Sequence, residues 1–133
     1  MKVINIKWLC EEIKEGDFTL MGIYSGLICV AFSDYNNYKI GDIIEKPLTL
    51  NEYDVMTSND DIGIWEFSSW GTNPIEDDYS YKIVGILIKM GKYESLLQVK
   101  DFIFELDTDS IPNDIKEGEI IELKTDRITI PWD

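Results

Sequence analysis

Two seven-residue segments of nearly identical sequence constrain the fold of this chain more than any other feature. They are Lys39-Ile40-Gly41-Asp42-Ile43-Ile44-Glu45 and Lys116-Glu117-Gly118-Glu119-Ile120-Ile121-Glu122, and they match at five of seven positions. Glycine adopts the positive φ that a tight turn requires, and paired isoleucines are typical of a strand that enters a core. The pattern therefore predicts a glycine turn followed by a strand at two places in the chain.

Two weaker similarities extend this pattern into an internal repeat. Thr19–Ile23 resembles Lys82–Ile86, and Ile28–Asp34 resembles Ile103–Asp109. We predict a single compact unit, 1–133, with similar halves at about 17–56 and 80–131 and a connector at 57–79. The alternative is that isoleucine-rich strands resemble one another by chance.

The remaining segments favour a β-rich fold with one helix. Ile6, Leu9, Cys10 and Ile13 have helical spacing before Gly16, which predicts a short N-terminal helix. Gly22 and Gly85 stand inside strand-like runs, where glycine suits a bulge or a sharp bend. The predicted fold class is α+β, predominantly β. It has two similar small antiparallel β-barrel or half-sandwich repeats and one short N-terminal helix.

One sheet fused from both halves is the alternative to two barrels. At the level of architecture, the order of turns and strands resembles oligonucleotide-binding and SH3-like small barrels.

The charge balance excludes several partners. The chain has 12 basic and 26 acidic side chains, which gives a net charge of −14. Nucleic acids and anionic membranes attract proteins through lysine and arginine, so they repel a chain of this kind. We therefore predict no nucleic-acid partner and no membrane partner, but a basic protein partner.

The chain lacks the residues of common catalytic and metal sites. It contains no histidine, and Cys10 and Cys29 do not have the spacing of a zinc or redox motif. We expect both cysteines to be small apolar core residues. Asp107-Thr108-Asp109 begins like an EF-hand loop, but Pro112 and Gly118 stand where glycine and glutamate are needed. We predict no catalytic residue, no metal, no cofactor and no enzymatic activity; a small enzyme that uses carboxylates alone is an alternative.

The N-terminal residues lack the apolar run of a signal peptide. No stretch approaches the roughly 20 apolar residues of a membrane span. A cytoplasmic location is expected.

The connector carries the candidate contact surface, because it sets aromatic side chains between two acidic clusters. Interface hot spots favour tryptophan at the centre, with charged residues at the rim. The predicted partner-binding residues are Asp60, Asp61, Trp65, Phe67, Trp70, Glu76, Asp77 and Asp78. The alternative is that Trp65 and Phe67 are strand residues that face the core.

Small size, acidity and exposed aromatics favour an inhibitor that binds a basic toxin or effector. In these features the chain is similar to bacterial immunity proteins and to phage-encoded anti-defence inhibitors. The most concrete hypothesis is an immunity-type protein that neutralises a basic bacterial toxin, for instance a nuclease. The alternatives are a ligand- or glycan-binding accessory module using Trp65 and Trp70, a phage-encoded anti-defence protein, and a phage structural component.

Overall fold

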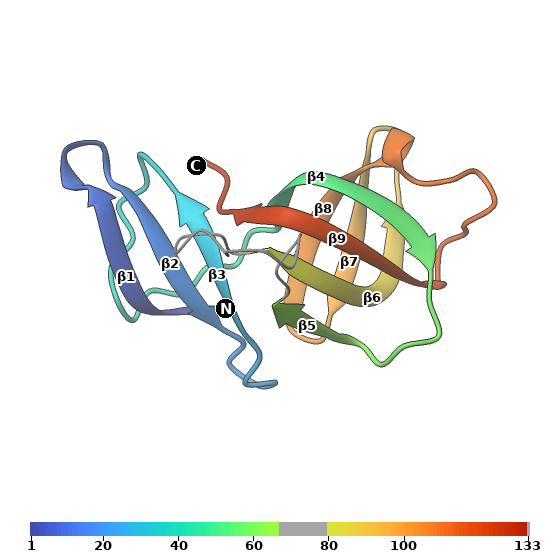
Figure 1. The fold of residues 1–133 in the computed structure, drawn as a ribbon, viewed down its shortest axis with the longest axis horizontal. Helices are drawn as coiled ribbons and strands as arrows, with labels where there is room; N and C mark the ends of the chain where they lie inside the picture. The colour runs from blue at the N-terminus through green and yellow to red at the C-terminus, as the bar shows by residue number, and fades with distance from the viewer. Residues whose placement is uncertain (67–79, 133) are drawn as a thin grey trace, which may run out of the picture.

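The computed structural model describes residues 1–66 and 80–132, and most of these residues lie in strands (Figure 1). The first strands are β1 (Lys2–Cys10), β2 (Glu15–Met21), β3 (Ile28–Ser33), β4 (Leu48–Thr57) and β5 (Gly63–Glu66). They are followed by β6 (Tyr81–Met90), β7 (Glu94–Val99), β8 (Phe102–Asp107) and β9 (Ile120–Thr129). Two short 3₁₀ turns, η1 (Glu11–Ile13) and η2 (Thr108–Ser110), complete the described elements.

Five of these strands close into a barrel in the order β9, β4, β8, β7 and β6. Strand β9 pairs antiparallel with both β4 and β6, and β4 pairs parallel with β8 at Leu48 and Phe104. A barrel this narrow is filled by its own side chains. Those buried inside it include Ile83, Leu87, Leu97, Phe102, Phe104, Leu106, Ile121 and Leu123. The predominantly β fold and the barrel architecture are therefore confirmed.

Strands β1, β2 and β3 form an antiparallel sheet beside the barrel (Figure 1). Strand β3 joins this sheet to the barrel, since Ala31 and Phe32 pair in parallel with Ile128 and Thr129 of β9. All nine strands of the described residues thus belong to one continuous sheet, as the fused-sheet alternative proposes.

The prediction of two similar barrels is wrong, because the first half does not close. Its Lys39–Glu45 segment supplies no strand to complete a wall. Its contact with β1 consists of a few backbone hydrogen bonds and an isolated bridge between Ile43 and Lys2. The face of this sheet is covered instead by single side chains. Ile44 is fully buried in the cluster that also contains Phe18, and the Tyr38 ring packs edge-on against Phe18.

The predicted N-terminal helix is also wrong. Lys2–Cys10 is strand β1, in which Ile6 and Trp8 are half-buried while Lys7 and Leu9 are exposed. This is the two-residue period of a strand. The helical spacing is misleading because the strand is irregular between Trp8 and Cys10 and then ends, so Leu9, Cys10 and Ile13 do not continue the alternation of Ile6 and Trp8. Only η1 has helical hydrogen bonding in this region.

The two similar segments do form the same glycine turn. Gly41 has φ +97° and Gly118 has φ +93°. In each turn the acidic side chain after the glycine accepts a hydrogen bond from the lysine N–H, at 2.8 Å for Lys39 to Asp42 and 2.9 Å for Lys116 to Glu119. The predicted turns are confirmed.

Each turn also docks on a strand in the same way. The Gly41 N–H donates to the carbonyl of Val3 in β1, and the Gly118 N–H donates to the carbonyl of Leu87 in β6, both at 2.7 Å. The turn therefore relates β1 to β6, so that β2 corresponds to β7. The predicted match of Thr19–Ile23 with Lys82–Ile86, which equates β2 with β6, is wrong.

We expect alanine at Gly41 or Gly118 to lower the free energy of unfolding by about 1 kcal/mol at each position. An added Cβ meets no atom within 4 Å at either site, so the loss measures backbone strain alone. Asparagine tolerates positive φ better and should recover part of the loss. Urea denaturation of the four variants provides the measurement; alanine variants as stable as the natural chain would contradict the shared turn.

A carboxylate on the barrel holds the loop between β2 and β3. Asp101, in the turn between β7 and β8, accepts hydrogen bonds from the N–H of Tyr24 at 2.8 Å and of Ser25 at 3.3 Å. The Ser25 hydroxyl donates to its other oxygen. Gly22 is required beside it, because a Cβ at this position would collide with the Asp101 carboxylate. This contact fixes one end of the three-stranded sheet against the barrel.

We expect Asp101→Asn to reduce both the stability of the protein at pH 7 and its sensitivity to acid. Partial burial raises the pKa of Asp101, but the hydrogen bonds from Ser25 and Tyr24 together outweigh this effect. The net pKa therefore lies below its usual range. A lowered pKa stabilises the fold above the unfolded value of about 4, and the contribution is lost as the pH falls through the folded value.

Thermal melting between pH 7 and pH 2.5 tests this, with the exposed Asp114→Asn as the matched control. Parallel loss of stability in both variants would contradict the role of Asp101.

Candidate protein-binding surface

Three of the predicted contact residues, Asp60, Asp61 and Trp65, are in the described part of the chain, and all three are exposed. Phe67, Trp70, Glu76, Asp77 and Asp78 lie outside the described residues. The described part of the candidate surface therefore consists of β5 and the strands next to it.

Trp65 lies on the surface of β5 rather than in the core. Its side chain is 42% exposed. The indole lies over Gly63, where an added Cβ would stand 2.9 Å from the ring, and the Lys82 ammonium is 5.7 Å from the ring centroid. Glycine at position 63 thus leaves room for the indole to lie against the strand. The alternative that Trp65 faces the core does not hold.

Lys82 on β6 connects Trp65 to the acidic residues. Its ammonium pairs with Asp60 at 2.6 Å and lies 3.9 Å from Glu122 of β9. The hydrogen bond to Asp60 raises the pKa of Lys82. Desolvation opposes this shift, while attraction to Asp60 and Glu122 adds to it, and the net pKa lies above its usual value. Asp60 therefore presents a paired charge, whereas its sequence neighbours predict one member of a cluster of like charges.

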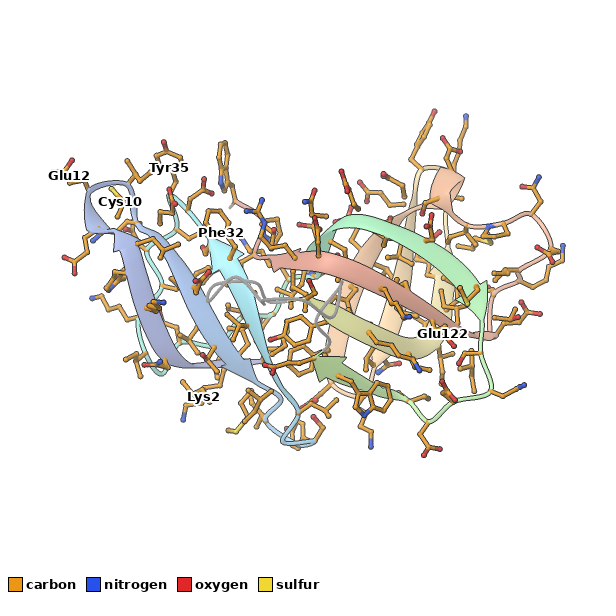
Figure 2. The ribbon with its side chains drawn as sticks, in the orientation of Figure 1. Lys2, Cys10, Glu12, Phe32, Tyr35 and Glu122 are labelled. Atoms are coloured by element: carbon orange, nitrogen blue, oxygen red, sulfur yellow. The ribbon has the colours of Figure 1, made fainter. Side chains whose placement is uncertain are left out.

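Residues paired across β4, β9, β6 and β5 extend this surface over the outside of the barrel. In the strand register, Asp54 lies opposite Lys124, Lys124 lies opposite Lys82, and Lys82 lies opposite Trp65. The four side chains therefore share one face of the sheet. A shallow depression of about 200 Å³ lies beside them, lined by Asp54, Met56, Glu122, Leu123 and Lys124. Figure 2 shows Glu122 on this side of the barrel. The exposed Met56 and Trp65 give the surface its apolar area.

A second acidic group lies on β7 and β8, and we call Glu94, Glu105 and Asp107 the acidic trio. In the register of the hairpin, Glu94 lies opposite Asp107, and Glu105 lies two residues before Asp107. All three side chains therefore share one face. Partial burial raises the pKa of Glu105, and a hydrogen bond to Glu94 and repulsion from Glu94 and Asp107 raise it further. The fold thus holds these carboxylates together against their repulsion.

The acidic trio was not predicted from the sequence. Glu105 and Asp107 have the two-residue spacing of a strand face, which was available as a signal. The register that brings Glu94 to the same place was not available, since it depends on how the hairpin between β7 and β8 closes.

We expect Glu105→Gln to raise the melting temperature at pH 7. A carboxyl whose folded pKa lies above its usual value of about 4.3 opposes folding when ionised, and this cost disappears as the pH falls through the folded pKa. The gain should therefore shrink towards pH 4. Thermal melting at both pH values measures it, with the exposed Glu45→Gln as the control. An unchanged or lower melting temperature at pH 7 would show that the trio is not under electrostatic stress.

The described residues contain no group of three or more histidine, cysteine, aspartate or glutamate side chains placed to hold a metal ion. Cys29 is buried, as expected, and burial raises the pKa of its thiol. Cys10 is exposed at the end of β1, so its expected core position is wrong. This strand lies at the outer edge of the sheet, where it leaves the residues at its end uncovered (Figure 2).

Comparison with protein-family models, with curated proteins and with solved structures finds no match to this chain. Among the described residues, no helix has the length and apolar character needed to cross a membrane.

Proposed function

We propose that this chain is an acidic inhibitor of a basic protein, most concretely an immunity-type protein that neutralises a basic bacterial toxin such as a nuclease. The observation that carries the proposal is the acidic trio, which the β7–β8 hairpin gathers on one face, and in which partial burial, a hydrogen bond to Glu94 and repulsion between the carboxylates raise the pKa of Glu105. A cationic partner would relieve this repulsion, so the electrostatic cost in the free protein becomes a gain on binding.

The overall charge supports the same conclusion. At a net charge of −14, long-range attraction accelerates the encounter with a basic partner and excludes acidic competitors. Rapid capture is what an inhibitor of a toxin needs, since the toxin acts as soon as it is free. An inhibitor of this kind would act in the cytoplasm of the cell that must be protected.

The face that carries Trp65 would mainly slow dissociation of the complex. Trp65 and Met56 offer exposed apolar area beside charged groups, which is the composition of an interface hot spot with a polar rim. Asp60, Asp61 and the acidic trio would act mainly on the rate of association. The five predicted residues between 67 and 78 remain candidates for the same contact.

The test begins with a basic protein that binds the immobilised chain, taken from the organism that encodes it, and that loses its toxic activity on binding. We expect neutralisation of the acidic trio (Glu94→Gln, Glu105→Gln, Asp107→Asn) to slow association about tenfold at low salt and to flatten its salt dependence. Trp65→Ala should mainly accelerate dissociation. Surface plasmon resonance separates the two rates.

The matched control also removes three charges, by neutralising Glu11 and Glu12 in η1, next to β1 at the far edge of the sheet, and the exposed Glu45. If this control slows association as much as the trio variant, the charge acts without a defined site. If neither variant alters association, the acidic surface is not where the partner binds.

A further inference from the structure

A second depression lies where the chain leaves β3, next to the C-terminal residues that follow β9. It has a volume of about 340 Å³ and is lined by Tyr35, Asn36, Asn37 and Trp132. Figure 1 shows the C-terminus beside the end of β3, and Figure 2 shows Tyr35 and Phe32 at that end. We call this depression the aromatic pocket.

The pocket exposes two aromatic rings at right angles. Tyr35 is 59% exposed and Trp132 is 66% exposed, and their ring centroids lie 5.5 Å apart at an interplanar angle of 86°. In an edge-to-face pair each ring keeps a face that the other does not cover. Two electron-rich faces are therefore available to a ligand.

Several hydrogen bonds hold the pocket in this shape. The indole N–H of Trp132 donates to the Asp34 carboxylate at 2.6 Å, which orients the ring and places a negative charge beside it. The buried Asn36 amide donates to Ser33 Oγ at 2.9 Å, and the Ile130 N–H donates to the Phe32 carbonyl at 2.8 Å. The C-terminal residues are thus fastened to the end of β3.

Tyr35 adopts a backbone conformation that a bulky residue rarely takes. Its φ is +57°, and its N–H donates to the carbonyl of Ile13 at 2.8 Å. Asparagine adopts this conformation more easily than tyrosine, yet the two asparagines stand at the next two positions. An exposed tyrosine recovers little of the strain through burial. Residues held in such conformations cluster at ligand-binding and active sites, although Lys14, Glu52 and Lys100 of this chain also have a positive φ.

We propose that the aromatic pocket receives an arginine or lysine side chain of a protein partner. The ring faces attract a cation through their quadrupoles, and the Asp34 carboxylate and the net charge of −14 add to the attraction. The same end of the sheet already stacks one guanidinium, since Arg127 lies 4.5 Å from the centroid of the Phe32 ring. This inference rests on the proposed function for the nature of the partner, but the pocket can be tested without it.

The first experiment uses small probes and the complete chain. Nα-acetyl-arginine amide and Nα-acetyl-lysine amide are titrated into ¹⁵N-labelled protein while the indole N–H signal of Trp132, assigned with Trp132→Phe, is followed by NMR. We expect a saturable shift with both cationic probes and a dissociation constant at least about threefold higher for the neutral isostere Nα-acetyl-citrulline amide. Equal binding of the neutral probe, or binding of none, overturns the inference.

Variants show whether the pocket itself is responsible. Tyr35→Ala and Asp34→Asn should each weaken binding of the arginine probe at least about threefold, whereas Tyr24→Ala removes another exposed tyrosine and should leave it unchanged. Each variant is first shown to keep the natural amide spectrum away from the mutated site. Stronger binding of glucose or N-acetylglucosamine than of the arginine probe would identify a sugar site and overturn the inference.

The second experiment separates this inference from the proposed function. With a basic partner in hand, Tyr35→Ala and Trp132→Ala should accelerate its dissociation at least about threefold, while Tyr24→Ala should not. If neither pocket variant alters dissociation, the inference fails and the proposed function stands. Specific binding of the arginine probe supports the inference even where no basic partner is found, a result that contradicts the proposed function alone.

Discussion

The pairing of β9 with strands on both sides is the interaction on which the rest of the structure depends. This strand hydrogen-bonds to β4 and β6, which closes the barrel, and its last residues pair with β3. Ile121 and Leu123 point into the barrel, while Ile128 lies at the junction with β3. Side chains of this one strand therefore belong to the buried cluster both inside the barrel and at the junction. The residues after β9 are then carried to the end of β3, where they build the aromatic pocket. Loss of β9 would therefore remove the barrel wall, the junction and the pocket together.

The apolar core of this fold is separate from the acidic groups of the proposed contact surface. The buried cluster is apolar, and the described acidic groups that bear on function lie outside it. Two of them illustrate opposite solutions: Asp60 is paired with Lys82, whereas the acidic trio is held together against repulsion. A sheet surface selected only for stability would place opposite charges across the hairpin. On the function proposed above, the trio is the part of this surface that a cationic partner would contact.

Local features of the structure follow from the sequence more closely than its global features do. The two glycine turns could be predicted because a positive φ and an acidic side chain that bonds the preceding lysine N–H are local requirements. The N-terminal helix was predicted in error because Ile6, Leu9, Cys10 and Ile13 fit a helix as well as an interrupted strand. Trp65 could be recognised as a contact candidate, but its position over Gly63 and Lys82 could not. The aromatic pocket was missed, since nothing near Tyr35 in sequence points to Trp132.

The sequence by itself determined the strong negative charge, the predominance of strands and the two turns at Gly41 and Gly118. These properties depend on composition or on a few consecutive residues. Only the tertiary structure decided that one half closes into a barrel while the other remains an open sheet, because closure depends on which strands pair across long separations. The same holds for the sites: Glu94 joins Glu105 through the register of a hairpin, and Tyr35 meets Trp132 because β9 ends beside β3. Contacts between distant residues carry no local signal, so the sequence supplies the groups and the fold brings them together.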